Sequence, residues 1–198
     1  MTASETDELL VRRFQDGSSD AFETLVQRHG ARVYNLCLRI LGDAEEAADA
    51  SQETFLAALR KLSSFRGDAA FTTWLHRVAV NTCYDSLRKK RRRPMLQLAP
   101  DEGDERPEPS LPTPDHAEGV ALSVDVAQAL AQVPEEFRVV LVLADVQDLP
   151  YEEIAAVLDI PVGTVKSRVF RGRAALGKAL GVTQGEPSGA SRTSEEEA

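Results

Sequence analysis

An acidic, proline-rich segment in the middle of the sequence, residues 94–122, limits what this chain can fold into. It carries six of the ten prolines and seven acidic residues against one basic residue. Proline removes a backbone hydrogen-bond donor and like charges repel, so such a segment neither sustains a helix nor buries much apolar surface. We therefore expect a flexible linker between two modules, residues 1–93 and 123–180, followed by a disordered tail at 181–198.

The net charge of −9 at first disfavours a nucleic-acid partner, because binding phosphates requires a local surplus of Lys and Arg. The whole acidic surplus lies in the predicted linker and tail, so the two modules together are neutral. Membrane-spanning apolar runs and a signal-peptide pattern are absent, which predicts a cytoplasmic protein. Two cysteines, Cys37 and Cys83, cannot form a disulfide framework.

Apolar residues recur at helical spacing throughout the N-terminal module. Four such stripes are present, and local signals mark their ends, such as Gly42 after the second stripe and Asp43 with Glu46 before the third. No alternating stretch bounded by turn residues predicts a strand. We predict a compact bundle of four helices with short connections.

The C-terminal module has the spacing of a helix-turn-helix motif. One stripe stops before Pro134, a second ends around residues 145–148, and two further helices flank a break at residues 159–161. The inward-facing residues of this pair are predicted to be Ile154, Ala155, Leu158, Ile160, Val165 and Val169. The predicted fold class is all-α, with two small helical domains joined by a flexible linker.

The last helix of this motif is strongly basic, since residues 160–180 contain five basic residues and no acidic one. Arg can pair with guanine in the DNA major groove, and Lys or Ser can hold phosphates, so DNA binding is favoured. The alternative is a solvated helix face whose basic residues complement the helix dipole.

A second basic cluster, residues 88–93, ends the N-terminal module and is preceded by the aromatic residues Phe65, Phe71 and Trp74. Bases of single-stranded DNA stack on aromatic rings while Lys and Arg follow the phosphates, so this region is a candidate single-strand site. The alternatives are a solvated helix terminus for the basic cluster and a place in the core for Trp74.

Three motifs together give the chain a family resemblance: DASQETFL from Asp49, FRGDAAFTTWLHRVAVNT from Phe65, and PVGTVKSRVFRGR from Pro161. In this order and spacing they resemble an extracytoplasmic-function sigma factor of bacterial RNA polymerase, over about residues 7–93 and 123–180. The resemblance implies a sigma region 2 bundle and a sigma region 4 helix-turn-helix. It also implies a transcription initiation factor that directs polymerase to promoters and helps to melt them, without catalytic activity of its own.

The resemblance further implies which residues make contact. Asp49, Gln52 and Glu53 match the positions that bind core polymerase, although the acids of this helix also suit a helix N-terminus. A flipped base of the minus-10 element would meet the loop after Phe65 and the amide of Asn81, which could otherwise be a solvated surface group. The full minus-10 set is Phe65, Phe71, Trp74, Asn81, Arg88, Lys89, Lys90 and Arg91.

For the minus-35 element the implied set is Lys166, Ser167, Arg168, Phe170, Arg171 and Arg173. Of these, Arg168 and Arg173 are expected on phosphates, and Phe170 either touches DNA or packs between helices. The implied partners are core RNA polymerase, at the clamp of its largest subunit and the flap region, promoter DNA in duplex and melted form, and an anti-sigma factor. No cofactor, metal ion or small-molecule substrate is implied.

Two other classes of protein fit less well. A stand-alone helix-turn-helix regulator would account for residues 123–180 but leaves the motifs of residues 43–81 without a role. An enzyme is disfavoured because the histidines are scattered and neither a phosphate-binding glycine loop nor HExxH occurs. His76 and Cys83 fall short of a four-ligand zinc site, and we expect His76 at the surface and Cys83 in the core.

Overall fold

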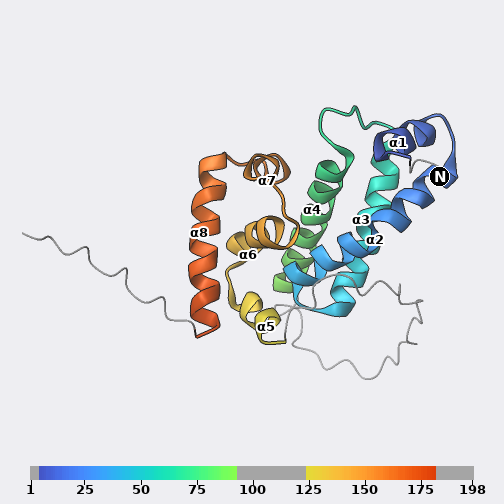
Figure 1. Cartoon of the computed structure of the whole chain (residues 1–198). Helices are drawn as coiled ribbons and strands as arrows, with labels where there is room; N and C mark the ends of the chain where they lie inside the picture. Colours follow the sequence, from blue (N-terminus) through green and yellow to red (C-terminus); the bar gives the residue numbers. More distant parts are fainter. Residues whose placement is uncertain (1–4, 93–123, 182–198) are drawn as a thin grey trace, which may run out of the picture.

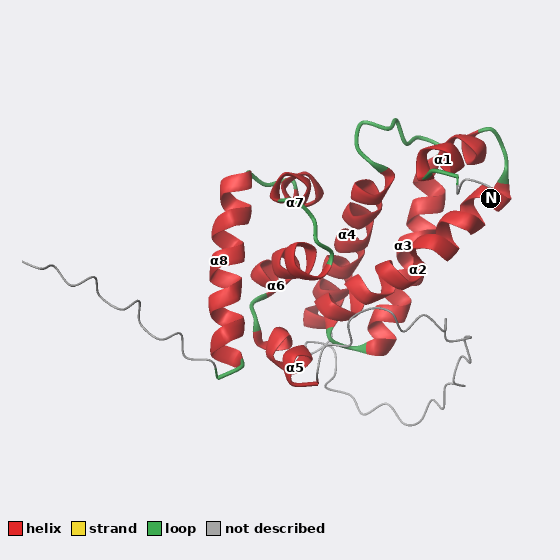
Figure 2. Ribbon diagram, viewed as in Figure 1, coloured by secondary structure: helices red, strands yellow, loops and turns green. Residues whose placement is uncertain are grey.

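The computed structural model describes residues 5–92 and 124–181, and all regular structure within these ranges is helical (Figures 1 and 2). The predicted linker at 94–122 and the tail from residue 182 lie outside the described residues. The N-terminal module contains α1 (Asp7–Gln15), α2 (Ser19–Leu41), α3 (Ala44–Leu62) and α4 (Phe71–Arg92). The C-terminal module contains α5 (Val124–Gln132), α6 (Glu135–Leu141), the π-helical turn η2 (Val142–Val146), α7 (Tyr151–Leu158) and α8 (Val162–Ala179). The predicted all-α, two-domain fold is confirmed.

The helix ends follow local signals in the sequence. Gly42 ends α2 in the left-handed conformation (φ 76°), which costs glycine little because it lacks a Cβ. The next residue, Asp43, caps α3, and its carboxylate accepts a hydrogen bond from the Glu46 backbone N–H at 2.9 Å. Prolines directly precede three helices of the C-terminal module, at positions 134, 150 and 161.

The core of the N-terminal module forms around α2, which packs against α1, α3 and α4. His76 of α4 belongs to this core with only 3% of its surface exposed, so the expectation of a surface position was wrong. The cause is the register of α4, which directs His76 toward α2 and its residues His29 and Arg32. Burial, together with these neighbouring cations, lowers the pKa of His76 to about 4.

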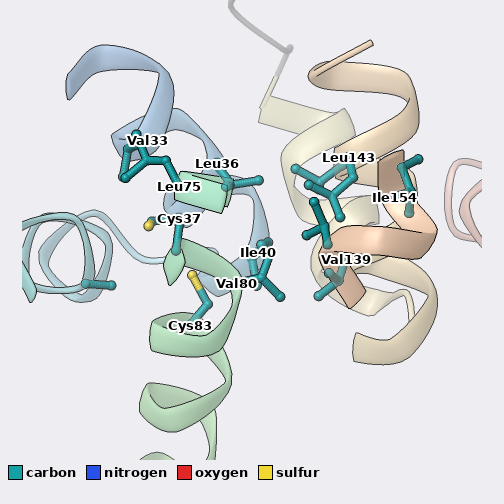
Figure 3. Close-up of a cluster of buried hydrophobic side chains, with 14 of the residues drawn as sticks. Val33, Leu36, Cys37, Ile40, Leu75, Val80, Cys83, Val139, Leu143 and Ile154 are labelled. Carbon is teal, nitrogen blue, oxygen red and sulfur yellow. The ribbon is translucent and has the colours of Figure 1, made fainter. Parts of the chain in front are cut away.

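Cys37 of α2 and Cys83 of α4 are free thiols and fully buried, as predicted for Cys83 (Figure 3). A hydrogen bond with Cys37, together with burial, raises the pKa of Cys83. Both thiols therefore act as small core side chains. None of the described helices combines the length and the apolar composition needed to cross a bilayer.

The helix-turn-helix of the C-terminal module consists of α7 and α8. Asp159 adopts a left-handed conformation (φ 54°) between them, and the Ile160 N–H donates to the Ala155 carbonyl at 3.1 Å. Of the residues predicted to face inward, Ile154, Val165 and Val169 are buried, and Ala155, Leu158 and Ile160 are half-buried against the same core. On the same buried face of α8, Gly172 lies against Leu141 of α6.

The two modules pack against each other, which the sequence did not predict. In Figure 1, α7 lies between α8 and α4, and α6 lies between α8 and the N-terminal bundle. Several arginines join the modules through hydrogen bonds, Arg32 and Arg138 among them. Arg32 of α2 donates to the Gln147 side-chain oxygen at 2.7 Å and to its carbonyl at 2.8 Å. Arg138 of α6 donates to the Ile40 carbonyl of α2 at 2.8 Å.

A single cluster of buried apolar side chains continues through both modules (Figure 3). The α2 residues Leu36 and Ile40 contribute from one side, and Val139, Leu143 and Ile154 contribute from the other. Removing such side chains from water is the main favourable term in protein association, so the shared cluster stabilises the packed arrangement.

Candidate nucleic-acid interface

The exposed side of α3 carries the residues assigned to polymerase binding. Asp49, Gln52 and Glu53 are all exposed, and their spacing places them on one face of the helix. Leu56 and Leu59 continue this face with 53% and 41% of their surfaces exposed. Sequence analysis missed Leu56. Its position could have indicated an exposed side chain, because Leu56 lies three residues after Glu53 and outside the buried stripe of α3.

The basic end of α4 is paired with acidic side chains of its own chain. Lys89 lies 3.7 Å from the Glu53 carboxylate, Lys90 lies 2.9 Å from that of Glu46, and Arg88 lies 2.8 Å from Asp85. Arg91 pairs with Glu135 of the C-terminal module. Exposed ion pairs of this kind contribute little to stability, so phosphates can replace the carboxylates at low cost.

The loop between α3 and α4 (Figure 2) holds Phe65, and the other two aromatic residues named by sequence analysis, Phe71 and Trp74, lie in the first turn of α4. The ring centroids of Phe65 and Trp74 are 5.2 Å apart, and Phe71 packs edge-on to Phe65 at 6.3 Å. Gln15 of α1 fixes the loop, because its amide donates to the Phe65 carbonyl at 2.9 Å and to the Leu62 carbonyl at 3.1 Å.

The three aromatic residues differ in accessibility. Phe65 and Trp74 are half-buried and line a pocket of about 250 Å³, whereas Phe71 is only 1% exposed and belongs to the core. Phe71 is therefore not available to a ligand, and its ring packs against the rings of Phe65 and Trp74. The pocket is also lined by Ser64, Arg66, Asp68, Ala69, Thr73, Arg77 and Ala156.

Asn81 lies farther along α4, with its side chain exposed. It lines a second pocket, of about 310 Å³, together with Arg77, Val80 and Tyr84 of α4 and with Val157, Leu158, Asp159 and Arg168 of the C-terminal module. Sequence analysis did not name Arg77 and Tyr84. Arg77 lies four residues before Asn81 and Tyr84 three residues after it, and this helical spacing could have placed all three on one side of α4.

The outer face of α8 brings together Lys166, Ser167, Phe170 and Arg171, all exposed. Phe170 is 77% exposed, the highest value among the exposed large apolar side chains of the described residues, so it does not pack between helices. Arg168 and Arg173 lie at the edges of this face, where Arg168 pairs with Glu136 at 3.3 Å and Arg173 with Asp145 at 2.6 Å. The Asp145 carboxylate raises the pKa of Arg173.

The surfaces of α4 and α8 carry cationic and aromatic side chains. Among the described residues, no group of three or more His, Cys, Asp and Glu side chains is placed to hold a metal ion. An exposed basic helix with one projecting ring can enter a DNA groove, and paired aromatic residues beside basic ones can stack bases.

Comparison with known protein families identifies both modules. The model of sigma-70 region 2 matches residues 25–93, and the model of sigma-70 region 4 matches residues 123–176. Among solved structures, that of CnrH in complex with the cytosolic domain of CnrY is similar, with a TM-score of 0.67 and 28% identity over 91% of this chain and 100% of CnrH. The sigma factor RpoE of Bartonella quintana, solved with the anti-sigma factor NepR, shares the fold with a TM-score of 0.65 at 23% identity, covering 82% and 98% of the two chains.

Full-length relatives agree with this result. The RNA polymerase sigma-H factor of Pseudomonas aeruginosa is 41% identical over 192 residues, which cover 91% of this chain and 96% of the relative. The ECF RNA polymerase sigma-E factor of Escherichia coli K12 is 40% identical over 182 residues, covering 89% and 95%. The chain therefore belongs to the extracytoplasmic-function (ECF) sigma factors, the transcription initiation factors of bacterial RNA polymerase.

Proposed function

We propose that the N-terminal module binds core polymerase through α3 and melted minus-10 DNA through α4, and that the C-terminal module reads the minus-35 duplex through α8. The domain division proposed for these roles is residues 1–93 and 123–180, with 94–122 as the connecting segment. The single observation that carries the proposal is the exposed face of α8, where Lys166, Ser167 and Arg171 surround the projecting ring of Phe170.

On α8 the proposed roles follow from chemistry. Arg171 can pair with a guanine edge, and the apolar ring of Phe170 can contact a thymine methyl group or a sugar. Lys166 and Ser167 can hold phosphates beside them. Arg168 and Arg173 would reach phosphates only after exchanging the carboxylates of Glu136 and Asp145.

On α4 and the preceding loop, we propose that Phe65 and Trp74 provide rings on which unpaired bases stack, and that Asn81 bonds a base edge with its amide. The basic residues Arg88 to Arg91 would follow the phosphates. Phe71 supports these rings without touching DNA, because its side chain is buried.

On α3 the proposed partner surface is a basic one on the polymerase clamp, for which Asp49 and Glu53 supply negative charge and Gln52 an amide. Leu56 adds an exposed apolar side chain at the centre of this face, of the kind that an interface covers.

We also propose that an anti-sigma factor controls this chain. Support comes from CnrH, which resembles 91% of this chain and was solved with the cytosolic domain of CnrY bound, and from RpoE of Bartonella quintana, which was solved with the anti-sigma factor NepR. We further propose that the protein acts in the cytoplasm and has no catalytic activity of its own.

Run-off transcription with purified core polymerase over a promoter library tests the proposal. The chain is expected to give promoter-dependent products that core polymerase alone does not give, and their absence would contradict the proposal. The substitution Glu53→Lys should abolish polymerase binding and transcription. The matched substitution Glu23→Lys, at an exposed position of α2, should preserve both.

A further inference from the structure

Helix α1 lies outside the match to sigma-70 region 2, which begins at residue 25, yet it is joined to the loop between α3 and α4 (Figure 2). The contact is made by its last residue, Gln15. The Gln15 side-chain nitrogen donates to the Leu62 carbonyl at 3.1 Å and to the Phe65 carbonyl at 2.9 Å. Because an amide NH₂ group has two hydrogens, it can serve both carbonyls at once.

These two carbonyls lie at the ends of the turn that leads from α3 into the loop. The Phe65 backbone N–H closes this turn by donating to the Leu62 carbonyl at 3.1 Å. Leu62 is the last residue of α3, and carbonyls of a last helical turn have no partner inside the helix. The following residues, 66–70, are all exposed, so packing does little to hold the rest of the loop. The orientation of Phe65 therefore depends on Gln15.

The first residue of α1 reaches the same aromatic residues by a different route. The Asp7 carboxylate lies 2.8 Å from Nε2 of His29, whose side chain is buried. The His29 ring lies 5.5 Å from the ring of Phe71. Phe71 in turn packs against Phe65 at 6.3 Å and against Trp74 at 5.8 Å. Helix α1 thus supports the aromatic residues at both of its ends.

We infer that Gln15 is a positioning residue for the minus-10 strand: it holds Phe65 and the start of the loop in the conformation in which an unpaired base can enter the pocket beside Trp74. The inference rests on the proposed function in assigning a base to this loop. Gln15 does not line that pocket, so it acts through the loop backbone. A loop that is ordered before binding loses less conformational freedom when the base enters, which favours binding.

Three substitutions isolate the two hydrogen bonds. Gln15→Met keeps the length of the side chain and removes both donors without adding charge. Gln15→Lys places an ammonium donor at similar reach and should restore the contact. The matched control, Gln27→Met, makes the first change again at an exposed position of α2. All three variants should unfold as cooperatively as the wild type, because both glutamines are exposed.

The fluorescence of Trp74 reports on the loop without DNA, because Trp74 is the single tryptophan of the chain. Its ring centroid lies 5.2 Å from that of Phe65, so release of Phe65 uncovers it. In the free full-length chain, Gln15→Met should shift the emission to longer wavelength and increase quenching by acrylamide. Gln15→Lys and Gln27→Met should behave like the wild type. Equal quenching in all four proteins would overturn the inference.

Strand binding by the holoenzyme tests the positioning role itself. The probes are the non-template minus-10 strand of a selected promoter and a series in which one base at a time is replaced by an abasic site. The wild type should lose affinity where the captured base is missing. Gln15→Met should bind the intact strand about tenfold more weakly, as expected if its loop is competent about one-tenth of the time. On the strand that lacks the captured base, Gln15→Met and the wild type should bind equally tightly.

The pattern across the strands separates positioning from general damage. A loss that is the same on every strand would overturn the inference, because the effect of Gln15 would then be independent of the base. Equal affinity of Gln15→Met and the wild type for the intact strand would also overturn it. If the wild-type holoenzyme binds intact and abasic strands alike, the proposed function fails, whereas the Trp74 measurement still shows whether Gln15 orders the loop.

Discussion

His76 is the residue whose environment differs most from its expected one. It is 3% exposed, its Nδ1 has no hydrogen-bond partner in the structure, and Arg32 and His29 lie nearby. Burial in these surroundings favours the neutral imidazole and lowers its pKa to about 4, against 6.5 for a free histidine. Between pH 4 and pH 6.5 the His76 imidazole is therefore protonated more readily in the unfolded chain than in the folded chain.

This difference predicts acid sensitivity. The stabilising effect of neutral His76 is complete above pH 6.5 and is lost as the pH falls toward 4, by on the order of 3 kcal/mol in total. Urea unfolding at a series of pH values should reveal the slope, and His76→Gln should remove most of it. His116→Gln, which leaves the two buried histidines His29 and His76 in place, is the control. An unchanged slope in His76→Gln would show that His76 is not the titrating group.

Phe170 gives the second prediction at the scale of single residues. Phe170→Ala should weaken duplex binding by about 1–2 kcal/mol, or five- to thirtyfold, because the ring is proposed to contact DNA. The unfolding free energy should change by less than about 0.5 kcal/mol, since the ring is 77% exposed. Leu180→Ala, which removes another exposed apolar side chain near the end of α8, should leave duplex binding intact. Fluorescence anisotropy with a selected minus-35 duplex measures the affinities.

At the scale of elements, the close packing of α6 against α8 depends on Gly172. A Cβ at this position would lie 2.8 Å from Cγ of Leu141, a buried side chain. Gly172→Ala should therefore destabilise the protein by about 1–3 kcal/mol through overpacking. Gly163→Ala, in the first turn of the same helix with open space around it, should be neutral or stabilising by up to about 1 kcal/mol. If chemical denaturation finds both variants more stable, the helices are not in such close contact.

Most of the element boundaries could be predicted from the sequence because their signals are local. Gly42, the Asp43 cap and the three prolines before helices each act within a few residues of the chain. The apolar spacing likewise identified the buried side of each helix. Burial of His76 was not predicted, because it depends on which side of α4 meets α2, and that is decided by packing between distant residues.

The packing of the two modules had no local signal at all. In two of its main contacts an arginine donates to a backbone carbonyl, Arg138 to that of Ile40 and Arg77 to that of Ala156. Any sequence would provide such carbonyls. Leu36 and Ile40 of α2 are also ordinary core residues of a helical bundle, so nothing in their pattern indicates a second neighbour. The sequence therefore predicted the separate surfaces of α3, α4 and α8 but not that α7 covers one of them.

At the scale of the whole molecule, Arg138 connects the ends of two helices. It is 9% exposed and donates to the carbonyls of Ile40 at the end of α2 and of Ala131 and Val133 near the end of α5. Burial lowers the pKa of this guanidinium, and the negative helix ends favour its charge. One side chain thus donates hydrogen bonds to carbonyls of both modules.

Arg138→Met should consequently reduce stability by at least about 2 kcal/mol, because buried carbonyls lose their donors. It should also reduce the cooperativity between modules, replacing one calorimetric transition with two or with a broadened one. The control Arg12→Met, at an exposed position of α1, should unfold like the wild type. A single sharp transition in Arg138→Met would mean that the apolar cluster alone couples the modules.

The apolar cluster that continues from Leu36 and Ile40 into Val139 and Leu143 also makes the molecule sensitive to temperature. Burial of apolar surface is less favourable in cold water than in warm water, so cooling should loosen the packing of α7 over α4. We therefore expect the two modules to separate more readily in the cold than at moderate temperature, even though each module keeps its own helices.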